Sequence, residues 1–202
     1  MESSGRPDGS GPQGEDTYYE YLVHQSIFDG DSFELTDEDC SEVDREFVQF
    51  YHRRICWLRL QEYELAVLDA DHTLGLMDLC RTHSDDEHWI MSHEQYRPFV
   101  LFHRTQAAAL GALDDNGPES AIQEVSQGLD QLRELFVAHE VEEHFEEDEL
   151  VTRLVEFRES LREQYEVGRT LQEKLADAVA AEEYELAAQL RDELAKRTSG
   201  PL

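Results

Sequence analysis

Histidine and glutamate side chains, the residue types that bind metals, gather in one short segment, residues 139–149. In the zinc motif HExxH the two histidines are four residues apart and share one face of a helix. His139 and His144 are five residues apart, which places them about 140° apart around a helix. A di-metal carboxylate site needs a glutamate three residues before the histidine, and Val141 holds that position. The pattern favours a solvated acidic helix end over a metal site.

The remaining histidines form no catalytic pattern either. His83, His88 and His93 follow one another at five-residue steps, so on a helix they rotate around the axis instead of converging. His103 lies in an apolar stretch and is predicted to be a satisfied core histidine. The sequence contains no P-loop and no local signature of a nucleophile with its base. We therefore expect no enzyme activity, no catalytic residue, no metal and no cofactor. A metal-dependent enzyme built on residues 139–149 is kept as an alternative.

The charge of the chain restricts its partners. The 202 residues carry 47 Asp+Glu against 17 Lys+Arg, a formal net charge of −30. Binding to nucleic acid or to an anionic membrane requires a basic surface, so we expect neither contact. The start of the sequence has no apolar leader, and no apolar run is long enough to span a membrane. The three cysteines form no CxxC pair, which is typical of a reducing compartment. These features predict a cytoplasmic protein.

The acidic residues concentrate in two segments. Residues 1–43 have a net charge of −11 and residues 139–149 a net charge of −7. The first segment begins with Gly, Ser, Pro and Gln, a composition that favours disorder. It continues with an aromatic cluster at 18–23 that either folds back on the chain or docks on a partner, and we favour folding back. We predict that 1–43 is a largely disordered tail. A second functional alternative is an acidic DNA mimic that inhibits a basic nucleic-acid-binding protein.

Residues 44–138 show the apolar periodicity of antiparallel helical hairpins. A first pair of helices is expected to begin near Ser41, with Asp44 as a weakened capping box, and to turn at 60–62. A second pair is expected over about 95–113 and 119–138, with Pro118 at its first turn. This region is therefore predicted to be an all-α body.

The first of these hairpins resembles a tetratricopeptide (TPR) repeat. The residues that sit where that repeat packs its two helices are Trp57, Tyr63, Ala66 and Leu74. The resemblance implies a surface that holds a second protein client. It also implies that Arg53 and Arg59 line a groove for the carboxylate at a partner's C-terminus, although Arg53 replaces the asparagine usual there.

Residues 139–169 are predicted to form an acidic connecting helix. Its apolar positions alternate in steps of four and three, namely Leu150, Leu154, Phe157 and Leu161. This seam covers about two heptads, which is too short for an independent coiled coil but sufficient for packing against neighbouring helices.

The C-terminal residues 170–197 are predicted to form a helical hairpin. Thr170 and Glu173 are spaced as a capping box, and Leu171 and Leu175 begin an apolar stripe. Residues 181–183 make a tight reversal before the returning helix. A hairpin of this size cannot bury all of its apolar surface by itself. The remaining surface must pack either on the helix at 150–161 or on another protein.

This hairpin closely resembles the UVR motif of the excision-repair proteins UvrB and UvrC, which also occurs in ClpC-type unfoldases and their McsA-type regulators. The core pattern Tyr-Glu-x-Ala-Ala-x-x-Arg-Asp is intact over 184–192. In that family the hairpin is a protein-docking device, so the resemblance implies contact through Tyr184, Ala187, Ala188 and Leu194. It also implies ion pairs, across the hairpin or with the partner, from Arg191 and Asp192. With Leu171 and Leu175 from the apolar stripe, these residues make up the predicted partner-binding surface.

The sequence thus predicts an all-α protein of TPR-like antiparallel hairpins, a long helix and a UVR hairpin. The predicted function is a non-enzymatic adaptor or regulatory subunit. By resemblance, its hairpin docks on an excision-repair component of the UvrB/UvrC type or on a Clp-type protease component. A homodimer is left open.

Overall fold

The computed structural model describes residues 1–198, which form helices connected by short loops and contain no strand. The all-α fold is therefore confirmed. The helices are α1 Tyr18–Asp29, α2 Asp37–Leu60, α3 Tyr63–His83, α4 Glu87–Glu94, α5 Arg97–Asn116, α6 Pro118–Ala138, α7 Glu149–Tyr165, α8 Leu171–Ala180 and α9 Tyr184–Thr198, with 3-10 turns η1 Pro12–Gly14, η2 Gly30–Ser32 and η3 Glu142–Glu147. None of these described helices combines the length and the apolar character needed to cross a membrane.

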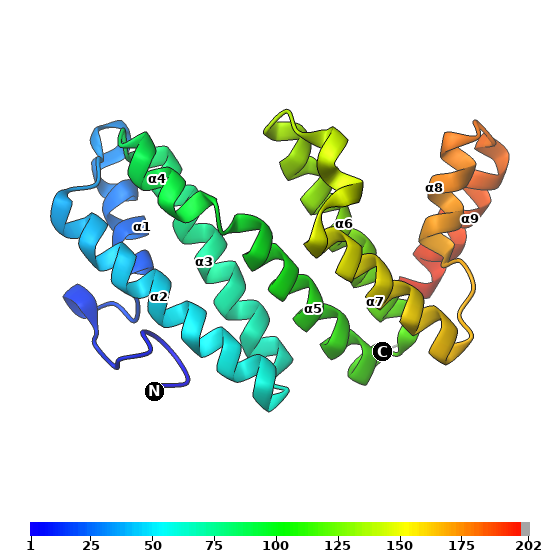
Figure 1. Ribbon diagram of the computed structural model, residues 1–202, viewed down its shortest axis with the longest axis horizontal. Coiled ribbons are helices and arrows are strands. Elements are labelled where there is room, and N and C mark those ends of the chain that lie inside the picture. Colours follow the sequence, from blue (N-terminus) through cyan, green and yellow to red (C-terminus); the bar gives the residue numbers. More distant parts are fainter. Residues whose placement is uncertain (199–202) are drawn as a thin grey trace.

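The helices follow one another along an elongated array (Figure 1). α2 and α3 form an antiparallel hairpin, α5 packs on α3, α6 returns along α5, and α7 packs on α6. The two hairpins predicted from the periodicity are thus present, although the short helix α4 lies between them along the chain. Their TPR-like character stays a prediction.

Helix α2 begins earlier than Ser41, where the sequence placed its start. Thr36 is the N-cap residue, because its Oγ1 accepts a hydrogen bond from the Asp39 backbone N–H at 3.2 Å. The Asp39 carboxylate accepts in return from the Thr36 N–H at 2.8 Å. A capping box with aspartate at its third helical position therefore adds a turn to the predicted helix, and the weaker pair Ser41 and Asp44 lies inside α2.

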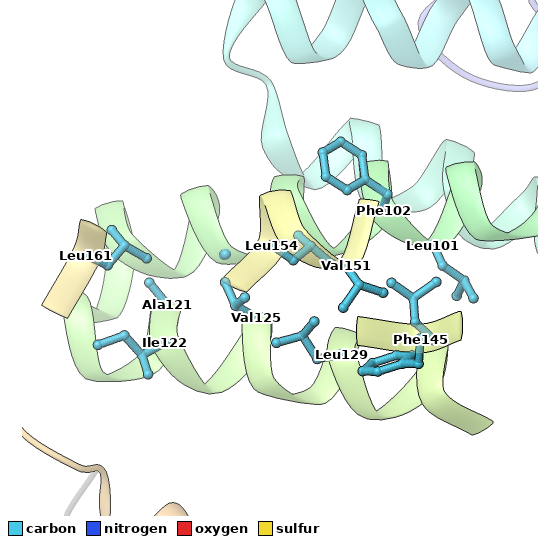
Figure 2. Packing of buried hydrophobic residues seen from close by; sticks show 12 residues of the cluster. Leu101, Phe102, Ala121, Ile122, Val125, Leu129, Phe145, Val151, Leu154 and Leu161 are labelled. Atoms are coloured by element: carbon cyan, nitrogen blue, oxygen red, sulfur yellow. The ribbon is translucent and has the colours of Figure 1, made fainter. Parts of the chain in front are cut away.

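The largest apolar core lies between α5, α6, α7 and η3 (Figure 2). Val151, Leu154 and Leu161 of α7 face α6, where Ile122 and Val125 are fully buried. The two other members of the predicted seam, at 150 and 157, are partly buried against the same core. The seam on α7 therefore packs on the body of the same chain.

The first 43 residues differ from the largely disordered tail that their composition predicted. α1 places Tyr18 and Leu22 in a core with residues of α2 and α3. Ahead of α1, the Arg6 side chain is only 3% exposed, and its Nη2 lies 2.7 Å from a carboxylate oxygen of Glu42. The segment is ordered because its aromatic residues and one arginine bury against α2 and α3. The predicted domain boundaries themselves stay predictions.

One buried carboxylate, Glu46 of α2, holds this N-terminal segment in place. Its oxygens accept hydrogen bonds from the backbone N–H groups of Tyr18 (2.7 Å) and Tyr19 (3.0 Å). The Nε2 atom of His72 lies 2.9 Å away. Burial raises the pKa of Glu46, but the hydrogen bonds from His72 and from the two backbone groups outweigh burial and leave the pKa below its ordinary value. Glu46 therefore binds as a carboxylate at neutral pH.

Candidate docking hairpin

The C-terminal hairpin consists of α8 and α9, and its local structure confirms the predicted cap and reversal. Thr170 Oγ1 accepts a hydrogen bond from the Glu173 N–H at 3.3 Å, and the Glu173 carboxylate accepts from the Thr170 N–H at 2.8 Å. α8 ends at Ala180, and Glu182 adopts a left-handed φ of 59° in the reversal. α9 then begins at Tyr184. Two short antiparallel helices result.

A small core holds the two helices together. Its buried residues are Ala178 of α8 with Ala187 and Leu190 of α9, and Leu171 and Leu175 pack against them partly buried. The alanines at the contact allow the helix backbones to approach closely. Three predicted partner contacts, at positions 171, 175 and 187, therefore serve the interior of the hairpin. Leu194 is half-buried at the far end of α9.

The exposed residues of α9 form a stripe beside this core. Tyr184 is 68% exposed, and Ala188 and Arg191 are exposed as well. Positions i, i+4 and i+7 share one face of a helix, so the three side chains lie in one row. Val179 and Leu186 are also exposed apolar residues. These two were absent from the predicted contact set, although their apolar character next to the periodic positions was a signal for them.

Arg191 and Asp192, which the resemblance expects to form ion pairs across the hairpin or with a partner, pair with each other along α9. Arg191 Nη2 lies 3.0 Å from a carboxylate oxygen of Asp192, its neighbour on α9, and the two side chains are 71% and 64% exposed. An ion pair this exposed contributes little to stability. Both groups are therefore available for contact with another molecule.

The hairpin joins the body through a narrow link. α8 and α9 pack mainly on each other at the end of the array, and residues 166–170 connect them to α7 (Figure 1). Arg162 of α7 forms an ion pair with Glu173, and its Nη1 donates to the carbonyl of Gly168 at 3.2 Å. An open space of about 410 Å³ lies between α8 and α6, lined by Gln127 and Gln172 among others. The alternative that the hairpin packs its apolar surface on residues 150–161 is thus not realised.

The two arginines predicted to line a TPR-like groove do not form a pair. Arg53 is buried, and its Nε and Nη2 donate to the Asp69 carboxylate at 2.7 to 3.2 Å. Its Nη1 donates to the carbonyls of Glu2 (3.2 Å) and Gly5 (2.8 Å). Arg59 is exposed in the last turn of α2, six residues further on, and therefore about 120° away around the helix. The guanidinium of Arg53 therefore binds groups of the same chain.

The acidic segment 139–149 is not the continuous helix that the sequence predicted. α6 ends at Ala138, Glu140 takes a left-handed φ of 57°, and η3 follows before α7 begins. Phe145 anchors the segment in the core, while His139 and His144 are exposed. Across residues 1–198, no group of three or more His, Cys, Asp or Glu side chains is arranged so that it could hold a metal ion. The ligand convergence required by the metal-enzyme alternative does not occur there.

A family model for the UvrB/uvrC motif, UVR, matches residues 167–196. The match covers α8 and most of α9, so it coincides with the hairpin and with the link that precedes it. The presence of a UVR motif is thereby confirmed, and this motif indicates a protein-interaction function. No curated protein and no solved structure matches the chain.

Proposed function

We propose that this protein is an adaptor or regulatory subunit that docks through its UVR hairpin on a component of an excision-repair system or of a Clp-type protease. The observation that supports the proposal most is the exposed row of Tyr184, Ala188 and Arg191 within the segment that matches the UVR motif. Tyrosine and arginine are enriched among the residues that dominate binding energy at protein interfaces. The protein is proposed to work in the cytoplasm and without catalysis.

The surroundings of Tyr184 define the partner surface. A shallow depression of about 530 Å³ is lined by Tyr184 and Leu186 together with Glu182, Glu183 and Glu185. A partner that fits must offer an apolar contact for the tyrosine ring and basic side chains around it. Charge complementarity of this kind accelerates association and is screened by salt.

The row of Tyr184, Ala188 and Arg191 is exposed while the hairpin is attached to the body. Arg162 of α7 pairs with Glu173 of α8 at the base of the hairpin, and α9 packs mainly on α8. The TPR-like surface of the body is proposed to bind a second client protein.

The proposal is tested by affinity capture from the native organism with wild-type protein and with the double variant Tyr184→Asp plus Ala188→Arg. Both substitutions replace exposed side chains, so the hairpin is expected to stay folded. We expect the double variant to lose a UvrB/UvrC-type or Clp-type protein that the wild type captures. Direct binding of that purified protein is then expected to weaken at least tenfold, because one anchor residue typically contributes 2 kcal/mol or more.

A matched control carries the same kinds of exchange on the body, Val137→Asp plus Ala138→Arg. Both positions are exposed near the end of α6, so this variant is expected to capture the same proteins as the wild type. Equal recovery of partners by wild type and by the hairpin variant contradicts docking through α9. Recovery of only unrelated proteins contradicts the proposed partner classes.

A further inference from the structure

A groove on the body, away from the UVR hairpin, combines an aromatic lining with a buried cation. It has a volume of about 820 Å³ and lies between α2, α4 and the start of α5. Its walls include the rings of Phe47, Tyr51, Tyr96 and Phe99, and Arg54 lines it as well. Most small-molecule sites have volumes of 300 to 1,000 Å³ and an apolar lining with few polar groups. The groove has these properties.

Arg54 is the unusual residue of the groove, because its charge is buried without a counter-charge in contact. The residue is 1% exposed. Its Nη1 donates to Thr73 Oγ1 at 3.1 Å, while its Nε has no hydrogen-bond partner. Within the described part of the chain, no carboxylate lies within ion-pair distance of the Arg54 guanidinium. The neighbouring Arg53 differs completely, because it binds both oxygens of Asp69.

The environment of Arg54 disfavours its charge. Burial lowers the pKa of Arg54 to about 10, and the Asp69 charge offsets only part of this effect. The Tyr51 ring lies 5.9 Å from the guanidinium carbon, a distance at which a cation–π contact is weakly favourable. Nearby, His103 is buried with its Nδ1 unpaired, so it is not the satisfied core histidine predicted from the sequence. A buried cation without an anionic partner costs free energy, and an arriving anion recovers it.

At the other end of the groove lies a carboxylate, Asp44, that already has hydrogen-bonding partners within the chain. Asp44 lies 3.0 Å from His93 Nε2 and accepts a hydrogen bond from Trp89 Nε1 at 2.9 Å. Asp44 and Arg54 are ten positions apart on α2, a rise of about 15 Å. The apolar rings lie between these two ends. A ligand that fills the groove therefore needs an anionic head at Arg54 and an apolar body that points towards Asp44.

We propose that this groove binds an amphipathic carboxylic acid of small-molecule size, with its carboxylate on Arg54 and its apolar chain among the aromatic rings. A single negative charge matches the single cation. A doubly charged phosphate fits less well, because the chain carries a net charge of −30 that opposes the approach of a dianion. The site is separate from the UVR hairpin, so it does not depend on the docking proposal.

The test is isothermal titration calorimetry of the full chain with octanoate and with its neutral counterpart octanamide. We expect octanoate to bind wild type more tightly than octanamide. The variant Arg54→Met keeps an unbranched apolar stem and removes the guanidinium, so octanoate affinity is expected to fall about tenfold or more, as for a lost charged hydrogen bond. Octanamide affinity is expected to stay the same. The control Arg59→Met removes an exposed charge from the same helix and is expected to change neither affinity.

A second variant keeps the test decisive if Arg54→Met does not fold. Tyr96 is exposed at the wall of the groove, so Tyr96→Ser is expected to weaken octanoate binding several-fold without unfolding the body, whereas Tyr165→Ser on α7 is expected to leave it unchanged. The proposal is overturned if octanoate does not bind the wild type, or if octanoate and octanamide bind it with equal affinity. It is also overturned if the groove variants and the control variants change the octanoate affinity equally. Binding of a peptide's free carboxyl end without binding of octanoate also overturns it.

Discussion

The body and the UVR hairpin use the same residue types in opposite ways. In the body, apolar side chains fill continuous cores, and an arginine such as Arg53 is buried with its carboxylate partner. Among the described side chains of α8 and α9, the buried core consists of Ala178, Ala187 and Leu190, and the Arg191–Asp192 pair is exposed. The body is therefore able to hold its structure by itself. The hairpin keeps a minimal core and leaves a tyrosine, an alanine and an arginine in contact with solvent.

The difference predicts which contacts support the fold and which are available for binding. Removing one member of a buried ion pair leaves an uncompensated buried charge, whereas removing one member of an exposed pair leaves a solvated charge. Side chains that the body needs should therefore affect unfolding, and side chains of α9 should affect association.

The largest effect is expected for the buried pair of Arg53 and Asp69. Asp69→Ala leaves the Arg53 charge buried without its partner, so the free energy of unfolding is expected to fall by about 4 kcal/mol. Asp192→Ala, the corresponding change in the hairpin, is expected to alter it by less than about 0.5 kcal/mol. Denaturant unfolding followed by circular dichroism measures both. A similar loss for the two variants contradicts the proposed difference between body and hairpin.

A smaller effect is expected when acid protonates the body histidine His103. Burial, together with the charges of Arg54 and Arg153, lowers the pKa of His103 from 6.5 to about 4. Between these two values the unfolded chain binds a proton that the folded chain does not bind, so stability falls as the pH decreases through this range. Since one pKa unit corresponds to 1.36 kcal/mol, the loss at pH 4.5 is about 2 kcal/mol.

The variant His103→Gln isolates this effect from the many carboxylates of the chain. It cannot take up the proton, so its unfolding free energy is expected to lose about 2 kcal/mol less than that of the wild type between pH 7 and pH 4.5. The measurement is denaturant unfolding of both proteins at the two pH values. Parallel losses in the two proteins contradict a neutral buried histidine.

A third prediction concerns the independence of the hairpin. Leu190→Ala removes the largest buried side chain of the hairpin core, so local opening of α8 and α9 is expected to increase. The body is expected to keep its thermal midpoint within about 1 °C, because none of the described residues of α8 and α9 belongs to its cores. Hydrogen exchange, read helix by helix, distinguishes the two regions. Increased exchange in α6 or α7 contradicts an independent hairpin.

The sequence predicted the helices well because their signals are local. The capping box at Thr170 and the apolar steps on α7 act within a few residues, and the structure places both as predicted. The start of α2 differs because the sequence offers two capping boxes in succession, and the helix begins after the earlier one, at Thr36. Proline at 118 likewise opens α6 as its position suggests.

The features missed from the sequence depend on contacts between distant residues. Residues 1–17 have a composition typical of disorder, yet Arg6 and the Arg53 contacts with Glu2 and Gly5 attach them to the body. The groove around Arg54 likewise lies between α2 and the more distant helices α4 and α5. The apolar periodicity of a helix does not predict contacts between distant segments. Periodicity alone also does not separate the inner face of α9, where Ala187 is buried, from the neighbouring outer face, where Tyr184 and Ala188 are exposed.

The smallest effect is expected at the link between the two regions. Arg162→Ala removes the ion pair with Glu173 and the hydrogen bond to the Gly168 carbonyl, both at the partly exposed base of the hairpin. Stability is expected to fall by less than about 1 kcal/mol. The orientation of the hairpin is expected to vary more, because little other packing fixes it. Small-angle scattering of the wild type and the variant measures this variation in orientation, and Arg158→Ala on the same helix is the control. A broader distance distribution for Arg162→Ala alone identifies Arg162 as the residue that sets the angle between the hairpin and the body. Equal distributions for the two variants contradict this role.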